Sequence, residues 1–170
     1  MCDERITHPL GPVVDARSRV LILGTMPSVA SLERKQYYGH KRNQFWPMIF
    51  TLMDKPPEEA YDRRIAFALQ QGIAIWDVVA SCVRPGSLDS HIRDVIPNNF
   101  DGFFESWPGL RRVFFNGASA LQLFKRHVGL AVLKDLPFTL LPSTSPAYTL
   151  PFEQKLQAWV QVKIELEKEM

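Results

Sequence analysis

The chain has 170 residues, of which 46% are hydrophobic, and its formal net charge at pH 7 is only +2. These values predict one globular domain over residues 1–170, and they argue against a polycation that binds nucleic acid through bulk charge. Two cysteines are too few for a disulfide framework or an iron–sulfur cluster, and the four histidines lack a ligand-like spacing. We therefore expect no metal and no cofactor. Neither a signal peptide nor an apolar run near ~18 residues is present, so we expect a cytoplasmic protein that is not secreted and makes no membrane contact.

The first elements are an arm, a strand and a long loop. Residues 1–19 contain prolines without a clear period and predict an irregular arm that closes over a sheet. Val20–Leu23 is uniformly apolar and predicts a central buried strand. A polar and aromatic loop follows, until Asn43 provides a cap for a helix with Phe45 and Trp46 on its apolar face.

The rest of the chain alternates helical and strand patterns. We expect a helix over 58–71, a strand over 73–79, a loop over 81–99, a short helix over 100–107, a strand over 113–116, a helix over 118–127, a strand over 138–141, and a final helix over 152–169. This alternation predicts βαβ units. The expected fold class is therefore α/β, a three-layer α/β/α sandwich around a central, mainly parallel four-stranded sheet.

Three of the expected strands end in polar loops, which should meet at the carboxyl edge of the sheet and form a binding cleft. The first loop alternates basic residues with aromatic ones, a mixture that suits phosphate contact and base stacking. A purely structural role stays open for the aromatic residues, for Asn43 and for Asp77. The aromatic residues can belong to the core, Asn43 can serve only as a cap, and Asp77 at the end of its strand can be either a solvated acid or a desolvated acceptor.

Four ordered motifs carry a resemblance to a known family. They are Gly24-Thr25-Met26-Pro27-Ser28, the segment from Gln36-Tyr37-Tyr38 through His40, Arg42 and Asn43 to Phe45-Trp46, the segment Gly72–Val78 with Asp77, and Leu141-Pro142-Ser143-Thr144-Ser145-Pro146-Ala147. Together they resemble the hypoxanthine-DNA (deoxyinosine) glycosylase branch of the uracil-DNA glycosylase superfamily.

The resemblance implies a monofunctional base-excision repair enzyme. It would hydrolyse the N-glycosidic bond of a deaminated base after flipping the nucleotide out of the DNA stack. The branch that the motifs resemble implies hypoxanthine as this base. It further implies no cofactor, double- or single-stranded DNA with a deaminated base as partner, a monomer, and a place in the bacterial cytosol or at the nucleoid.

The resemblance also assigns roles to two catalytic residues. Many relatives have a polar residue just before the proline of the first motif, and this chain has Met26 there. In the hypoxanthine branch the asparagine ahead of the Phe-Trp pair positions the water, and the resemblance implies this role for Asn43, whose amide would orient water without being a base. Asp77 would accept the ring N–H of hypoxanthine or uracil, and a role as general base stays open for it.

The remaining site residues fall into two groups. The expected base pocket comprises Gly24, Thr25, Met26, Pro27, Tyr38, His40 and Phe45. The expected DNA contacts are Ser28, Lys41, Arg42, Ser143, Thr144, Ser145 and Tyr148, the last as a wedge. Three alternatives remain, namely a uracil or broad deaminated-base glycosylase, a non-catalytic DNA-damage-binding module on the same fold, and an enzyme acting on free nucleosides.

Overall fold

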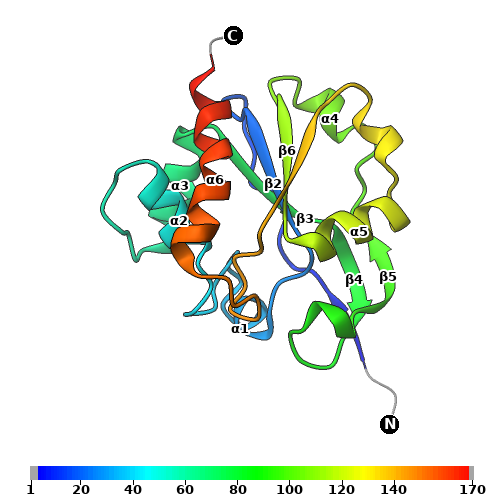
Figure 1. The fold of residues 1–170 in the computed structure, drawn as a ribbon. Helices are drawn as coiled ribbons and strands as arrows, with labels where there is room; N and C mark the ends of the chain where they lie inside the picture. The colour runs from blue at the N-terminus through cyan, green and yellow to red at the C-terminus, as the bar shows by residue number, and fades with distance from the viewer. Residues whose placement is uncertain (1–3, 169–170) are drawn as a thin grey trace.

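The computed structural model describes residues 4–168, and at its centre lies a sheet of four parallel strands in the order β3-β2-β6-β7 (Figure 1). The strands are β2 (Val20–Gly24), β3 (Ile73–Asp77), β6 (Arg112–Asn116) and β7 (Phe138–Leu141). Every residue of β2 and β3 is buried, because both faces of the sheet are covered. The predicted α/β class with a four-stranded parallel sheet is confirmed.

Helices cover the two faces of this sheet (Figure 1). One face carries α2 (Phe45–Leu52), α3 (Tyr61–Gln70) and α6 (Phe152–Glu167), and the other carries α4 (Phe103–Ser106) and α5 (Ala118–His127). The prediction started α3 at Glu58, whose side chain instead accepts the Ala60 N–H in the turn before the helix. The predicted end of the last helix at 169 lies outside the described residues, as do residues 1–3 of the arm. Among the described residues, none of the helices combines the length and apolar character needed to span a bilayer.

A second sheet of three antiparallel strands corrects two predictions. Its order is β1-β4-β5, with β1 at Arg5–Thr7, β4 at Val79–Val83 and β5 at Arg93–Pro97. The strand predicted over 73–79 is therefore two strands, separated by one residue and belonging to different sheets. The loop predicted over 81–99 is wrong, because it contains most of β4, the 3₁₀ turn η1 (Asp89–His91) and β5. The register of β4 with β5 is irregular and β5 is partly exposed, so neither strand has a regular apolar alternation.

The amino-terminal arm is more ordered than the irregular segment that its sequence predicts. Its β1 strand pairs with β4, and Val13 forms an isolated bridge with Ile75 at the free edge of β3. The two bridge hydrogen bonds measure 2.8 and 2.9 Å. The arm is thus attached to both sheets, and the residues between its two attachments are held against the carboxyl end of β3.

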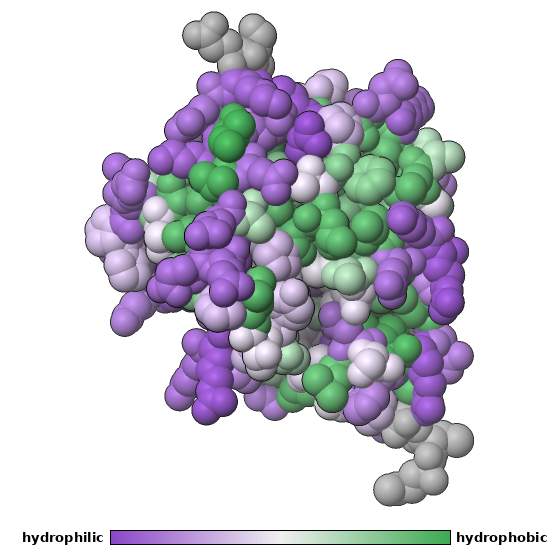
Figure 2. All heavy atoms as spheres, in the orientation of Figure 1, coloured by the Kyte–Doolittle hydropathy of each residue, from purple (hydrophilic) through white to green (hydrophobic). Residues whose placement is uncertain are grey.

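The opposite edge of the parallel sheet is β7, which is less buried than its apolar sequence predicts. Phe138 and Leu140 are exposed large apolar residues of this strand. Figure 2 shows apolar side chains gathered over β7 and the segment before it, beside the largely hydrophilic surface of α6. Phe138 and Leu140 lie two residues apart and therefore point to the same face of the sheet, and this face of β7 is incompletely covered.

Candidate active site

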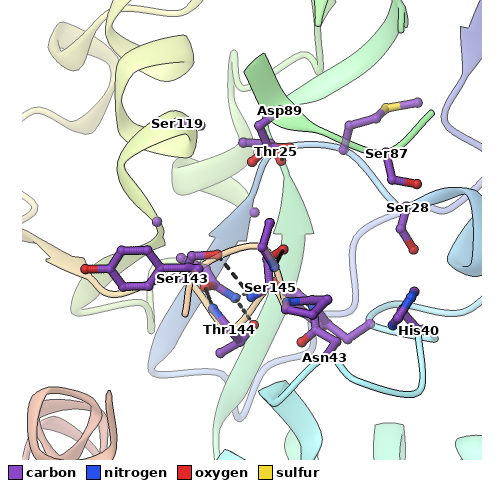
Figure 3. A pocket seen from close by; sticks show the side chains of 18 of the residues that line it. Thr25, Ser28, His40, Asn43, Ser87, Asp89, Ser119, Ser143, Thr144 and Ser145 are labelled. Atoms are coloured by element: carbon purple, nitrogen blue, oxygen red, sulfur yellow. Dashed lines mark hydrogen bonds between the residues drawn. The ribbon is translucent and has the colours of Figure 1, made fainter. Parts of the chain in front are cut away.

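The strand order locates a cavity at the carboxyl edge of the parallel sheet. β2 pairs with β3 on one side and with β6 on the other, so the order reverses at β2, and ligands of open α/β sheets bind outside the strand ends at such a point. A cavity of about 740 Å³ opens there (Figure 3). It is lined by Asp77 at the end of β3 and by four loops, which follow β2, β6 and β7 and connect β4 with β5. Four loops thus converge, where the sequence predicted three. The additional loop follows β6, whose last residue is Asn116.

Asp77 lies at the end of β3 and lines the cavity while being only 4% exposed. Its Oδ2 is 2.7 Å from Nε2 of His8, which comes from the amino-terminal arm. Its Oδ1 lies against the backbone of Gly24, so close that a Cβ on this glycine would sit 2.6 Å from that oxygen. Glycine is therefore required at the end of β2 for Asp77 to occupy its place.

Asn43 also lines the cavity and lies just before α2 (Figure 3). Its Oδ1 accepts the Phe45 N–H at 2.9 Å, so the amide bonds a backbone donor at the helix start, but the N-cap residue of α2 is Gln44 and not the predicted Asn43. This bond takes one of the two lone pairs of the amide oxygen and leaves the second for another donor. The adjacent Gln44 N–H donates to the Thr144 carbonyl at 3.0 Å, which ties this turn to the loop after β7.

Tyr38 and Phe45 form a stacked pair with ring centroids 3.9 Å apart. Phe45 is fully buried, whereas Tyr38 lines the cavity, so the expectation that Phe45 itself forms a pocket wall is wrong for this structure. The Tyr38 hydroxyl accepts a hydrogen bond from Asn116 Nδ2 at 3.3 Å. Burial, reinforced by the nearby Asp77 charge, raises the pKa of Tyr38, so its hydroxyl is a neutral donor at physiological pH.

The residues of the first motif shape the cavity largely through their backbone. The Thr25 hydroxyl donates to Asp89 Oδ1 at 2.8 Å, and the Pro27 carbonyl accepts from Arg84 at 2.7 Å. Met26 is buried in a small apolar cluster instead of reaching the cavity with a polar group. All three line the cavity, and Thr25, the only one of them with a polar side chain, has its hydroxyl proton committed to Asp89.

Ser28 has a capping role in the structure. Its Oγ accepts the Ser31 N–H at 3.2 Å and begins α1 (Val29–Arg34), a short helix within the segment that links the two halves of the first loop. Figure 3 places the Ser28 side chain beside Ser87 on the cavity wall. The Ser28 hydroxyl proton is committed in part to Ser31 Oγ at 3.2 Å.

The turn after β7 is anchored by buried hydrogen bonds. Thr144 is fully buried, and it both receives a bond from Asn116 Nδ2 and donates its N–H to Asn116 Oδ1, each at 2.9 Å. The Oγ atoms of Ser143 and Ser145 accept N–H groups two residues ahead, so each hydroxyl proton can still be donated outward. Thr144 is thus the anchor of this loop, and the two serines on either side are free to act as donors.

Lys155 of α6 supports the same loop from below. The side chain is 1% exposed, and its Nζ donates to the Tyr148 carbonyl at 2.8 Å. Desolvation lowers the pKa of Lys155. The Tyr148 ring lies 5.3 Å from the ammonium while the residue remains exposed, so it projects from the rim of the cavity.

The basic part of the first loop lies at the other side of the cavity. His40 lines the cavity, and its Nδ1 accepts the Arg42 N–H at 3.0 Å, which leaves the ring proton of the neutral imidazole on Nε2. Lys41 and Arg42 are exposed and do not line the cavity. The predicted site residues therefore separate into a lining set and an exposed basic pair beside it.

Comparison with known protein families identifies the family of this chain. The model of the uracil DNA glycosylase superfamily matches residues 12–166. The chain belongs to the uracil DNA glycosylase superfamily. Curated relatives agree, among them a hypoxanthine DNA glycosylase of Methanosarcina acetivorans, 37% identical over 64% of this chain and 69% of that one. A hypoxanthine DNA glycosylase of Methanosarcina barkeri is 34% identical over 62% of this chain and 68% of that one.

A solved structure shows the same fold in this superfamily. The solution NMR structure of a protein described as a "putative Uracil DNA glycosylase", from Methanosarcina acetivorans, superposes with a TM-score of 0.79 at 31% identity. The match covers 93% of this chain and 96% of that one. The family and these relatives confirm the predicted class of protein, a hydrolytic DNA glycosylase whose substrate is DNA.

The sequence analysis did not assign a role to three residues of this glycosylase, namely Asp89 and Asn116, which line the cavity, and His8, which contacts Asp77. His8 lay in an arm that was expected to be irregular, and Asp89 lay in a polar loop that was expected either to reach across a site or to be a plain connection. Asn116 was visible as the last residue of a predicted strand before a glycine, and its position at the same sheet edge was the signal that could have found it.

Proposed function

We propose that this glycosylase removes hypoxanthine from DNA by hydrolysing the N-glycosidic bond of a flipped-out deoxyinosine. The observation that carries the proposal is the buried Asp77 carboxylate, which lines the cavity with one oxygen held by His8 and the other beside Gly24. A carboxylate accepts but does not donate, so it pairs with the N1–H of hypoxanthine and not with the lone pair at N1 of adenine. The names of the two Methanosarcina relatives support the same base.

Base flipping accounts for the shape of the cavity. The glycosidic bond is inaccessible inside a duplex, so the nucleotide leaves the stack and enters the space between the strand ends. Within that space, the Tyr38 ring offers a face on which a base stacks, backed by Phe45. Gly24, Thr25, Met26 and Pro27 form the floor, and His40 faces the same space with an Nε2–H donor.

Hydrolysis requires one oriented water molecule. As the bond between the anomeric carbon and the base breaks, the sugar gains oxocarbenium character, and the oxygen of the water bonds to that carbon. The free lone pair of Asn43 Oδ1 accepts a hydrogen bond from one O–H of this water, which directs the water oxygen at the anomeric carbon. An amide does not take the proton, so the step depends on a transition state in which the base has largely departed with the bonding electron pair. The proton that the water loses ends on this departed base, and the products are the free base and an abasic site.

DNA is held by the groups around the cavity mouth. The Ser143 and Ser145 hydroxyls donate to phosphate oxygens next to the flipped nucleotide, with Thr144 fixing their loop. Lys41 and Arg42 add positive charge beside the cavity, and Ser28 lies on the cavity wall. Tyr148, exposed at the rim, fills the space vacated in the stack. The enzyme acts as a monomer on a deaminated base in either single- or double-stranded DNA.

The decisive experiment is single-turnover base release from duplexes that carry one inosine, uracil or xanthine, with alkali added to cleave the abasic product. We expect release from the inosine duplex and strand cleavage only after alkali. Asn43→Ala should lower the rate by about 100-fold or more, because the water loses its orientation, while DNA affinity stays close to wild type.

Two outcomes would contradict the proposal. Wild-type rates in Asn43→Ala would remove Asn43 from the chemistry, and preferred release of uracil would replace hypoxanthine as the substrate, since the N3–H of uracil also fits the Asp77 acceptor. Loss of the Phe45 cap bond is expected to cost about 1 kcal/mol. A melting curve of Asn43→Ala therefore accompanies the assay, so that reduced activity is not confused with reduced folding.

A further inference from the structure

His8 is a buried titratable residue that the proposed chemistry does not use. Its side chain is 1% exposed, and its Nε2 lies 2.7 Å from Asp77 Oδ2. It belongs to the arm and not to any of the four loops that line the cavity. A buried imidazole in direct contact with the carboxylate that faces the cavity affects how that carboxylate meets a substrate.

A backbone amide fixes the tautomer of this histidine. The Leu10 N–H donates to His8 Nδ1 at 3.0 Å, so Nδ1 is the unprotonated nitrogen of the ring. The ring proton then lies on Nε2 and points at Asp77. His8 is therefore a hydrogen-bond donor to the carboxylate, with its second nitrogen already occupied.

The arm holds this donor in place from both directions. The β1 strand pairs with β4, and the backbone N–H of His8 donates to the Ala80 carbonyl at 2.7 Å. Farther along, Val13 bridges Ile75, and the Tyr37 hydroxyl donates to the Gly11 carbonyl at 2.7 Å. These bonds fix the backbone on either side of the imidazole, so its position is set before any substrate binds.

The hydrogen bond from His8 gives the two carboxylate oxygens of Asp77 different roles. Oδ2 receives the His8 proton, and Oδ1 lies against Gly24 at the cavity. A carboxylate whose one oxygen already accepts a hydrogen bond is held in one rotamer. The other oxygen is consequently presented to the cavity as a hydrogen-bond acceptor.

We propose that His8 is a positioning residue that orients Asp77 and keeps its cavity-facing oxygen an acceptor for the ring N–H of the flipped base. The inference rests on the proposed function, because it assumes that Asp77 reads the base. It assigns part of the base selectivity to the amino-terminal arm. His8 itself does not touch the substrate in this scheme.

The test compares single-turnover excision of hypoxanthine by wild type, His8→Phe and His8→Gln. Phenylalanine fills the volume without a donor, and we expect a rate lower by about 10- to 100-fold with DNA affinity unchanged. Glutamine places an amide N–H near the Nε2 position and should recover most of the rate. Arg5→Ala is the matched control, since Arg5 holds the same arm through Ser81 and the Asp94 carbonyl without contacting Asp77.

A second measurement does not depend on activity. Nitrogen-15 NMR of the imidazole should show the Nε2–H tautomer for His8 in the wild-type protein, and an Nδ1–H tautomer would overturn the proposal.

The outcomes separate the two proposals. A wild type that releases no deaminated base refutes the proposed function, whereas an active wild type with an equally active His8→Phe refutes this inference alone. Equal losses in His8→Phe, His8→Gln and Arg5→Ala, together with lower melting temperatures, would reduce His8 to an anchor of the arm and also refute it.

Discussion

Gly24 is the residue on which the geometry of the site depends most directly. It is the last residue of β2, paired with Asp77 in the parallel register, and a side chain there would point at the carboxylate. A Cβ would also come 3.1 Å from the Tyr38 hydroxyl. Glycine at this place therefore permits the approach of two groups that face the cavity, and its backbone angles need no special region.

Gly24→Ala should consequently damage the site more than the fold. We expect base release to fall by about 100-fold or more, because Asp77 and Tyr38 are both displaced from their positions. Gly11→Ala is the matched control, since nothing lies within 4 Å of a Cβ at that glycine. Single-turnover rates and melting curves of both variants check this, and an active Gly24→Ala protein would show that the carboxylate tolerates displacement.

Among the elements, the antiparallel sheet contributes a carboxylate to the cavity. Asp89 lies in the η1 turn between β4 and β5, and the Thr25 hydroxyl ties it to the loop after β2. Desolvation raises the pKa of Asp89, in spite of this hydrogen bond and the nearby Arg84 charge, which both act in the opposite direction. Keeping the Asp89 carboxylate ionised in the folded protein therefore costs folding free energy.

The sign of this cost gives a pH-dependent prediction. Because the folded state binds the Asp89 proton more tightly than the unfolded chain, the cost is present above the folded pKa and vanishes as the pH falls below the ordinary value of 3.8. Asp89→Asn keeps an acceptor for Thr25 and should melt at a higher temperature than wild type at pH 7. This advantage should shrink toward pH 4.

Thermal melts across this pH range, with the exposed Asp101→Asn as a control for loss of one charge, measure the effect. If Asp89→Asn melted at a lower temperature at pH 7, the attraction of Arg84 would outweigh the burial of the carboxylate.

The elements that the sequence predicted well are those with a strong hydrophobic signal. Val20–Leu23 and the residues around Phe114 are apolar on both faces, as central parallel strands require, and their positions were predicted closely. The β4 and β5 strands have Ser81, an irregular register and exposed positions, so they lack a period of two. Their pairing is a tertiary property that no local pattern reveals.

The site shows the same division. Asn43 and Asp77 could be selected because each stands at the end of a recognisable element and within a motif. His8 could not, because its contact with Asp77 spans 69 positions of the chain and depends on the path of the arm. The place of Phe45 behind Tyr38 was likewise hidden, because motif spacing says that two rings are near each other but not which one covers the other.

At the scale of the whole molecule, the low net charge makes local charge decisive for DNA binding. Lys41 and Arg42 are exposed beside the cavity, whereas Lys125 and Arg126 are exposed near the end of α5. Since α5 begins directly after β6 and runs away from the strand ends, its last residues lie far from the cavity edge (Figure 1). The two pairs have equal charge and different positions.

This contrast predicts different salt dependence. Each phosphate contact contributes about 0.9 to the slope of log affinity against log salt, so replacing both Lys41 and Arg42 by Gln should reduce the slope by about 1.8. The corresponding replacement of Lys125 and Arg126 should leave it unchanged. Fluorescence anisotropy with an inosine duplex over a range of salt concentrations measures both slopes, and equal changes would indicate that only total charge matters.

The arm that carries His8 also bears on how the protein can be shortened. The superfamily model begins at residue 12, so a chain trimmed to the matched segment would retain the parallel sheet, the cavity floor and Asn43. It would lose β1 and the imidazole that donates to Asp77. The boundary of the shared core and the boundary of the complete site are therefore different, and an amino-terminal deletion that folds well would still lack a partner for its central carboxylate.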